Sequence, residues 1–123
     1  MQNFRIIIAG SREFDNYSLL ERIMDKLLSN IKYDIVIVCG KARGADTLGE
    51  RYAKEKGYEI DYYPAQWNLY GKRAGYIRNE QMAQNADALV AFWDGHSKGT
   101  KHMIDLAHKY NLMVRVKMYE REN

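Results

Sequence analysis

The sequence predicts one α/β domain over residues 1–123, a Rossmann-like three-layer sandwich with a five-stranded parallel sheet. Short apolar runs alternate along the chain with segments whose apolar residues recur at helical spacing, and this alternation is typical of βαβ units. A length of 123 residues suits one domain, and neither a linker nor an internal repeat interrupts the chain.

The expected elements follow one another in near-regular alternation. Strands are predicted over residues 4–9, 35–39, 59–63, 88–92 and 113–118. The third strand is more polar than the others, so we expect it near an edge of the sheet. Helices are predicted over residues 19–28, 45–56, 75–85 and 100–110. Right-handed crossovers would place these helices on both faces of the sheet.

Composition limits the classes of protein that remain. Hydrophobic residues make up 46% and charged residues 28%, an ordinary balance for a globular domain. Cys39 is the only cysteine, so no disulfide can form within the chain. The N-terminal apolar run is too short for a signal peptide or a membrane span, so we expect a cytoplasmic protein with no membrane partner. Because no residues show metal-ligand spacing, we expect neither a metal nor a cofactor, and His102 and His108 are predicted on a helix surface.

Three loops that follow predicted strands are rich in glycine. They contain Gly10-Ser11-Arg12, residues 40–46, and residues 94–100 just before the last helix. Because ligands of parallel sheets bind beyond the carboxyl ends of the strands, we expect these loops to form one site. Hydroxyls, the Lys98 cation and free amides at a helix start suit a phosphate. For any single one of these loops, the need for a tight turn would also explain its glycines without a ligand site.

The positive charge is concentrated on the same part of the chain. Segments 10–15, 40–46, 67–79 and 94–101 carry eight basic and four acidic residues, whereas the remainder carries eleven and twelve. A positive excess around the predicted mouth is what an anionic ligand requires. The connection from residue 64 to residue 74 adds Trp67 and Tyr70, whose roles stay open between stacking on a base and packing onto the domain or a second subunit.

The set of motifs resembles a known family. Gly10-Ser11-Arg12, Ala42–Asp46, Ala65–Trp67, Arg78-Asn79 and Trp93–Thr100 together resemble the YspA-like branch of the SLOG superfamily, and the resemblance runs from about residue 4 to residue 116. That superfamily groups the LOG-type phosphoribohydrolases with the Rossmann domain of DNA-processing protein A. The resemblance implies a Rossmann-like fold, nucleotide-related ligands and a homodimer.

The resemblance also points to one departure. Ser97–Thr100 occupies the place of the LOG motif GGxGT, and Arg78-Asn79 with Met82 resembles the LOG motif RKxxM, whose arginine is catalytic there. LOG enzymes carry a catalytic glutamate three positions after their GT, and Met103 stands at that position here. Arg78 would therefore be catalytic only if the chain is an enzyme, with Asp46 or Asp94 replacing the acid.

We therefore predict a domain that binds a nucleotide or nucleotide-derived ligand through its phosphate or phosphoribosyl group, as a sensor or sequestering module. The alternatives are a phosphoribohydrolase-type N-glycosidase acting on nucleoside monophosphates, and a single-stranded nucleic-acid binder. A nucleic-acid partner would require a longer basic track than one mouth, which favours a small molecule. Asp46 is expected either to cap its helix or to accept a ribose hydroxyl. The predicted ligand-binding residues are Gly10, Ser11, Arg12, Gly40, Arg43, Gly44, Asp46, Arg78, Asn79, Asp94, Ser97, Lys98, Gly99 and Thr100.

Overall fold

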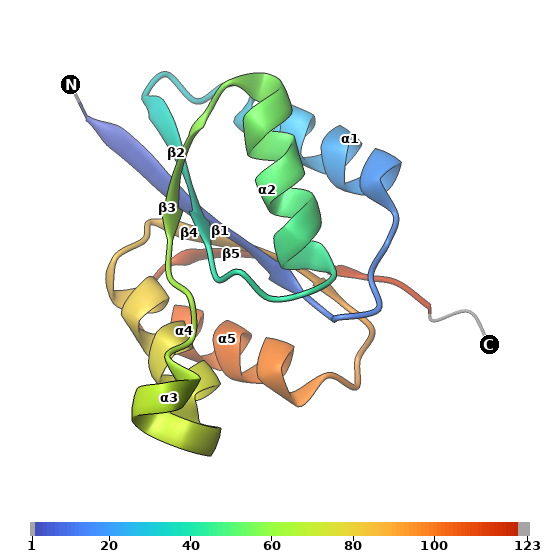
Figure 1. Cartoon of the computed structure of the whole chain (residues 1–123). Coiled ribbons are helices and arrows are strands. Elements are labelled where there is room, and N and C mark those ends of the chain that lie inside the picture. Colours follow the sequence, from blue (N-terminus) through green and yellow to red (C-terminus); the bar gives the residue numbers. More distant parts are fainter. Residues whose placement is uncertain (1, 121–123) are drawn as a thin grey trace.

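A parallel sheet organises the part of the chain that the computed structural model describes, residues 2–120 (Figure 1). Its strands are β1 (Asn3–Gly10), β2 (Asp34–Cys39), β3 (Glu59–Tyr62), β4 (Ala88–Trp93) and β5 (Met113–Met118). They lie in the order β3-β2-β1-β4-β5, and every neighbouring pair is parallel. The predicted fold class is confirmed, and the polar third strand lies at an edge as expected.

Two pairs of helices enclose the sheet. The pair α1 (Tyr17–Leu28) and α2 (Ala45–Lys56) covers one face, and the pair α4 (Ala74–Gln84) and α5 (Lys98–Lys109) covers the other. All four predicted helices are present within a few residues of their expected bounds. The connection predicted as a loop differs, because it contains the short helix α3 (Trp67–Tyr70) and the 3₁₀ turn η1 (Gly71–Arg73). A single helical turn is too short for apolar residues to recur at helical spacing, so the sequence pattern does not indicate it.

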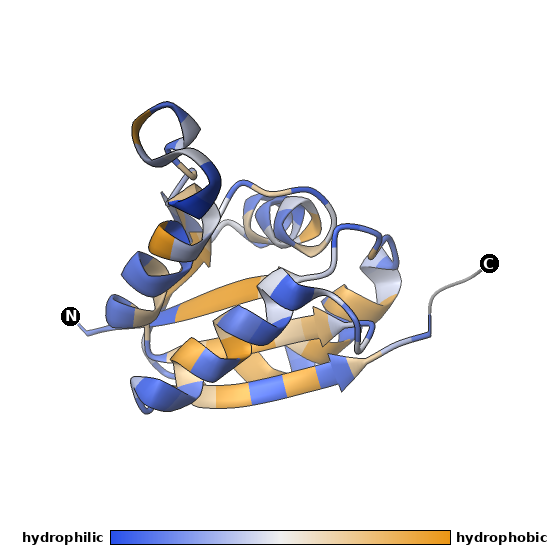
Figure 2. Cartoon of the chain, turned by 90° about the horizontal axis from the view of Figure 1, so that it is seen from below, coloured by the Kyte–Doolittle hydropathy of each residue, from blue (hydrophilic) through white to orange (hydrophobic). Residues whose placement is uncertain are grey.

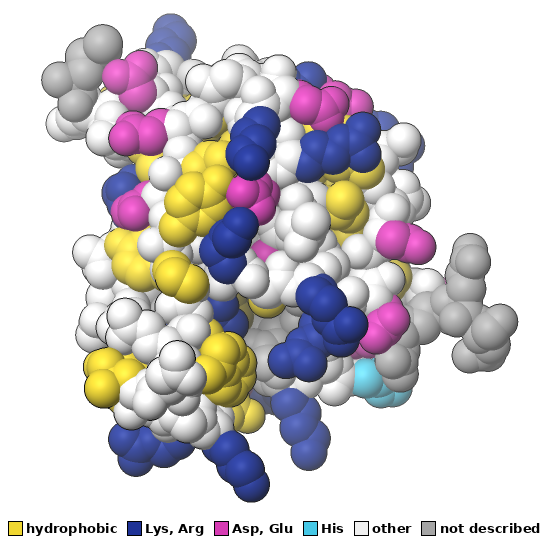
Figure 3. Space-filling model, viewed as in Figure 1, with side chains coloured by type: hydrophobic (Ala, Val, Ile, Leu, Met, Phe, Trp, Pro, Cys, Tyr) yellow, Lys and Arg dark blue, Asp and Glu magenta, His cyan; other side chains and the backbone are white. Residues whose placement is uncertain are grey.

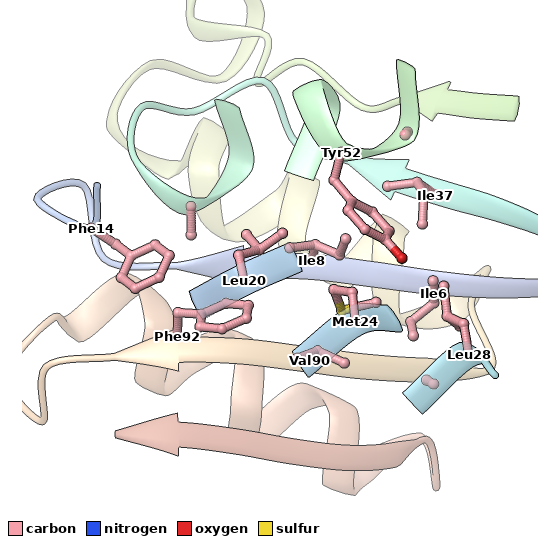
Figure 4. Packing of buried hydrophobic residues seen from close by; sticks show 13 residues of the cluster. Ile6, Ile8, Phe14, Leu20, Met24, Leu28, Ile37, Tyr52, Val90 and Phe92 are labelled. Carbon is pink, nitrogen blue, oxygen red and sulfur yellow. The ribbon is translucent and has the colours of Figure 1, made fainter. Parts of the chain in front are cut away.

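The core beneath α1 and α2 follows from the helical spacing of α1. Leu20, Met24 and Leu28 point at the sheet from successive turns and are all buried. Figure 4 shows them over Ile8 and its neighbours on β1. Phe14, just beyond β1, stacks on Phe92 at the end of β4 with 4.7 Å between ring centroids. These apolar contacts fix where β1 and β4 end, and therefore where the loops after them begin.

The core beneath α4 and α5 uses smaller and more flexible side chains. Met82 of α4 and Met103 of α5 are both 1% exposed and pack with Leu89 of β4. The three inner strands β1, β2 and β4 are apolar throughout their centres, whereas the outward sides of the helices are hydrophilic (Figure 2). At the end of β2, Cys39 is 1% exposed. Burial raises the pKa of its thiol to about 11.

The strand order places a crevice between β1 and β4. The order in which strands are added changes direction at this point. From β1 the chain adds β2 and β3 on one side, and it then returns to add β4 and β5 on the other side. In doubly wound sheets the loops after the two strands at such a point diverge and leave room for a ligand. No helix among residues 2–120 is both long and apolar enough to cross a bilayer.

Candidate functional site

A cavity of about 450 Å³ opens at the carboxyl ends of β1 and β4, beside the starts of α2 and α5 and one side of α4. Figure 3 shows a hollow on this face of the molecule with Lys and Arg side chains beside it. Eleven of the fourteen residues predicted to bind a ligand line this cavity: Gly10, Ser11, Arg12, Asp46, Arg78, Asn79, Asp94, Ser97, Lys98, Gly99 and Thr100.

Ser11 ties the loops of the cavity together. Its N–H donates to the carbonyl oxygen of Phe92 at 3.0 Å, and its own carbonyl oxygen accepts from the N–H groups of Phe14 at 3.1 Å and Ala45 at 3.4 Å. Its hydroxyl oxygen accepts from the N–H of Asp94 at 3.2 Å. One buried residue therefore joins the end of β1 to the start of α2 and to the loop after β4.

Two glycines allow the loops to approach this closely. Gly44 immediately precedes α2 with φ +75°, and a Cβ there would collide with the carbonyl oxygen of Ser11. A Cβ on Gly10 would collide with the carbonyl oxygen of Phe92 and lie 2.8 Å from the Cβ of Ala45. Gly44 lies outside the cavity lining, so the structure shows this packing role, and its contact with a ligand stays a prediction.

The start of α5 is held in place by its own loop. Ser97 caps the helix, because its hydroxyl accepts from the N–H of Thr100 at 3.4 Å and lies 3.0 Å from the Thr100 hydroxyl. The carboxylate of Asp94 accepts from the N–H groups of His96 at 2.8 Å and Ser97 at 2.9 Å. The indole N–H of Trp93 donates to the Ser97 carbonyl oxygen at 3.0 Å. These hydrogen bonds within the loop hold the start of α5 in place.

Space remains over the first turn of α5. Among residues 2–120, no heavy atom outside its chain neighbours and the helix backbone lies within 4 Å of the position that a Cβ on Gly99 would take. The adjacent Lys98 also lines the cavity. The first N–H groups of an α-helix have no acceptor within the helix, and they carry a partial positive charge. This turn therefore offers hydrogen-bond donors to anything that enters the cavity.

Asp46 and Arg78 form the inner end of the cavity. Asp46 is 6% exposed, and its carboxylate accepts from the N–H of Ala42 at 3.3 Å. Arg78 donates through Nη1 to the Gly40 carbonyl oxygen and through Nε to Oδ1 of Asn79 at 3.0 Å. Burial raises the pKa of Asp46 to about 6, although the positive charge of Arg78 and the N–H groups of Ala42 and Gly40 oppose that rise.

The structure gives three residues of this region positions that the sequence does not predict. Asp46 does not cap α2, since Gly44 occupies the capping position and makes no side-chain capping hydrogen bond. Arg43 is exposed and lies outside the cavity lining, so its contact with a ligand stays a prediction. Gly40 does not line the cavity but lies behind Asp46 and Arg78, which do. A Cβ on Gly40 would lie 2.8 Å from Oδ2 of Asp46 and 2.9 Å from Nη1 of Arg78, so glycine leaves room for both side chains.

The predicted excess of positive charge does not extend to the cavity wall. The lining contains three basic residues, Arg12, Arg78 and Lys98, and three acidic ones, Glu13, Asp46 and Asp94. Lys41, counted with the mouth on sequence grounds, instead pairs with Glu50 at 3.3 Å and lies over the Tyr62 ring. The basic character of the site is therefore local to Lys98 and Arg12.

Sequence reasoning missed one contact beside the cavity. Nδ2 of Asn79 lies 3.2 Å from Nδ1 of His102 and 3.4 Å from the Gly99 carbonyl oxygen. His102 is half-buried, with its ring edge-on to Tyr76, so it is not the plain surface residue that was predicted. Burial lowers the pKa of His102. Asn79 and His102 lie on different helices, and no local pattern links them.

Met103, which stands at the position that resembles the LOG glutamate, lies on the wall of the cavity. It is 1% exposed and lines the inner wall together with Met82. Among the described residues, no three His, Cys, Asp or Glu side chains are grouped as metal ligands.

The profile of one protein family agrees with the motifs, and relatives of the chain can be identified. The "Gene 61 protein" of Mycobacterium phage D29 is 35% identical over 117 residues, which span 89% of this chain and 93% of that protein. The crystal structure of a predicted subunit of tRNA methyltransferase from Methanocaldococcus jannaschii superposes with a TM-score of 0.48 at 13% identity, covering 96% of this chain and 68% of that one. A profile described as the YspA, cpYpsA-related SLOG family matches residues 4–70. More than half of the sequence thus matches the profile, and the chain belongs to the YspA, cpYpsA-related SLOG family.

Proposed function

We propose that this protein binds a nucleotide or nucleotide-derived small molecule, with a phosphate of the ligand at the start of α5. The open space over Gly99 carries the proposal, because an anion there would meet backbone N–H donors at the positive end of the helix. Lys98 and Arg12 line the same cavity and supply cationic side chains. Membership of a SLOG family supports a nucleotide-related ligand.

The acidic side chains of the cavity are compatible with a bound phosphate. Asp94 directs its carboxylate at two N–H groups of its own turn, so part of its charge is already compensated. Asp46 lies at the inner end beside Arg78, and its pKa of about 6 reduces its charge in mildly acidic solution. We propose that its carboxylate accepts a hydrogen bond from a hydroxyl group of the ribose, while the phosphate of the same ligand lies on α5.

Binding without catalysis is the role we favour, as a sensor or a sequestering module. Met103 offers no carboxylate at the position that resembles the LOG glutamate. One observation favours a second candidate function, a phosphoribohydrolase. Asp46 is a buried carboxyl with a raised pKa on the cavity wall, and such groups are candidates for general acid–base chemistry.

The binding proposal is tested first on the purified protein. Mass spectrometry of small molecules released by denaturation should detect a phosphate-bearing nucleotide or derivative. Titration should then compare Lys98→Ala with Lys101→Ala, since both lysines lie in the first turn of α5 but only Lys98 lines the cavity. We expect Lys98→Ala and Gly99→Val to weaken binding strongly with unchanged thermal stability, and Lys101→Ala to bind normally. Equal affinities for all four proteins would refute the proposal.

Catalysis is tested by incubating the protein with each ribonucleoside 5′-monophosphate and following free base by chromatography. We expect no base above background, because losing one positioned acid or base costs on the order of 100- to 10,000-fold in rate. Turnover that disappears in both Asp46→Asn and Arg78→Ala would establish the hydrolase instead.

A further inference from the structure

The cavity offers only a small aromatic surface to a base. Among the described residues, no Phe, Trp or Tyr lines it, His96 is the one aromatic ring of the lining, and the apolar part consists of Ala9, Ala42, Met82 and Met103. Flat aromatic side chains bind bases in many proteins because every base presents a π-face. An indole just outside the lining would give a base a larger face than the His96 imidazole does.

Trp67 does not line the cavity, but its indole approaches Arg78, which does. A Cβ built on Gly75 would lie 3.7 Å from Cη2 of Trp67 and 3.9 Å from Nη2 of Arg78, so the indole and the guanidinium flank the same point. Arg78 lines the cavity, and Gly75 adds no side chain between it and Trp67. A separate hollow lined by residues 65–69 leaves open space against the same indole.

The indole is not part of either core. Trp67 is 55% exposed and packs in neither hydrophobic cluster of the domain, although it is the largest side chain of α3. By contrast, Trp93 packs on the α4 and α5 side and donates to Ser97. An indole that contributes so little burial to the core is available for a contact that forms only with a ligand.

We propose that Trp67 is the base platform of the site and determines whether a ligand must carry a base. The inference rests on the proposed phosphate site at α5. The phosphate lies at Gly99, the sugar passes Arg78, and the base stacks on the indole at the outer edge of the cavity. Gly75 keeps the passage between Arg78 and Trp67 open. Ligands lacking a base would bind without using Trp67.

The test separates the base from the phosphate. Affinities for the four ribonucleoside 5′-monophosphates and for ribose 5-phosphate are measured with wild type, Trp67→Ala, Gly75→Val and the control Tyr33→Ala. Tyr33 is an aromatic residue that is 53% exposed and lines neither the cavity nor the hollow at residues 65–69. We expect Trp67→Ala and Gly75→Val to weaken the best-bound nucleotide on the order of tenfold and to leave ribose 5-phosphate unchanged. Tyr33→Ala should change neither affinity.

Fluorescence gives an independent reading. The nucleotide should quench tryptophan emission in wild type, and the quenching should vanish in Trp67→Phe, which retains Trp93 as the reference. Nucleotide affinity unchanged in Trp67→Ala would refute this inference and leave the phosphate site intact. Failure of every nucleotide and of ribose 5-phosphate to bind would refute the proposed function itself. A doubled molecular mass that Trp67→Ala abolishes, with nucleotide affinity unaltered, would assign the indole to a contact between two copies and overturn the inference.

Discussion

The β1 and α2 side of the cavity and the α3 segment beyond its lining are built in different ways. On the side of β1 and α2, Ser11 makes four hydrogen bonds to three neighbouring segments, and the glycines around it leave no spare space. By contrast, α3 presents Trp67, Leu69 and Tyr70 to solvent, and none of the three is buried. The first region is part of the core, whereas the second lies on the surface. Stability and ligand preference should therefore respond to different substitutions.

The largest contrast is expected between Gly44 and Gly71. Their backbones are nearly the same, with φ and ψ of +75° and −123° at Gly44 and +60° and −136° at Gly71. Gly44→Ala should lower the free energy of unfolding by at least about 3 kcal/mol, because the new Cβ also collides with the Ser11 carbonyl oxygen. In Gly71→Ala the new Cβ meets no described residue within 4 Å and should cost only the backbone strain, about 1–3 kcal/mol. Urea denaturation measures both, and equal losses would contradict the contrast.

Asp46 should make the buried side sensitive to pH. Its folded pKa, about 6, lies above its unfolded value of 3.8, so the folded state binds the proton more tightly. This contribution to stability is fully present below pH 4 and is lost as the pH rises through 6. Asp46→Asn should remove that decline, which amounts to a few kcal/mol. The urea midpoint followed from pH 4 to pH 7 tests this, with the exposed Asp15→Asn as control. Parallel profiles for wild type and Asp46→Asn would show the prediction to be wrong.

A smaller effect is expected at His102. Burial lowers its pKa from the ordinary 6.5, so its contribution to stability is present above pH 6.5 and is lost as the pH falls through the folded value. The amide of Asn79 can donate to Nδ1 only while that nitrogen is unprotonated. The NMR titration midpoint of His102 should lie below 6.5 and rise in Asn79→Ala, with less than about 1 kcal/mol at stake. A midpoint above 6.5 in wild type would contradict this account.

Much of the scaffold could be predicted because its signals are local. Runs such as Ile35–Cys39 are β-branched and continuous, which marks buried parallel strands, and the apolar spacing of α1 marks its sheet-facing side. The loops after β1 and β4 could likewise be assigned to one edge, since the alternation of elements determines which strand ends lie together.

The predictions that differ from the structure concern the directions of side chains and the contacts between residues far apart in the sequence. The same predicted loop contains Arg43 and Asp46, but only Asp46 lines the cavity, and the positive φ of Gly44 lies between them. The pairing of Asn79 with His102 depends on how α4 packs on α5. The positive excess counted over whole segments is not found in the cavity lining for the same reason. The charge of a segment does not indicate which of its side chains point inward.

The burial of Cys39 has a practical consequence for chemical labelling. Thiol reagents react with the thiolate, and a pKa of about 11 leaves on the order of one thiolate per thousand molecules or fewer near neutral pH, on a sulfur that is 1% exposed. Since the chain contains no second cysteine, a cysteine introduced on α3, such as Leu69→Cys, should be modified alone. A dye attached there would report on events at the outer edge of the cavity without removing any native thiol.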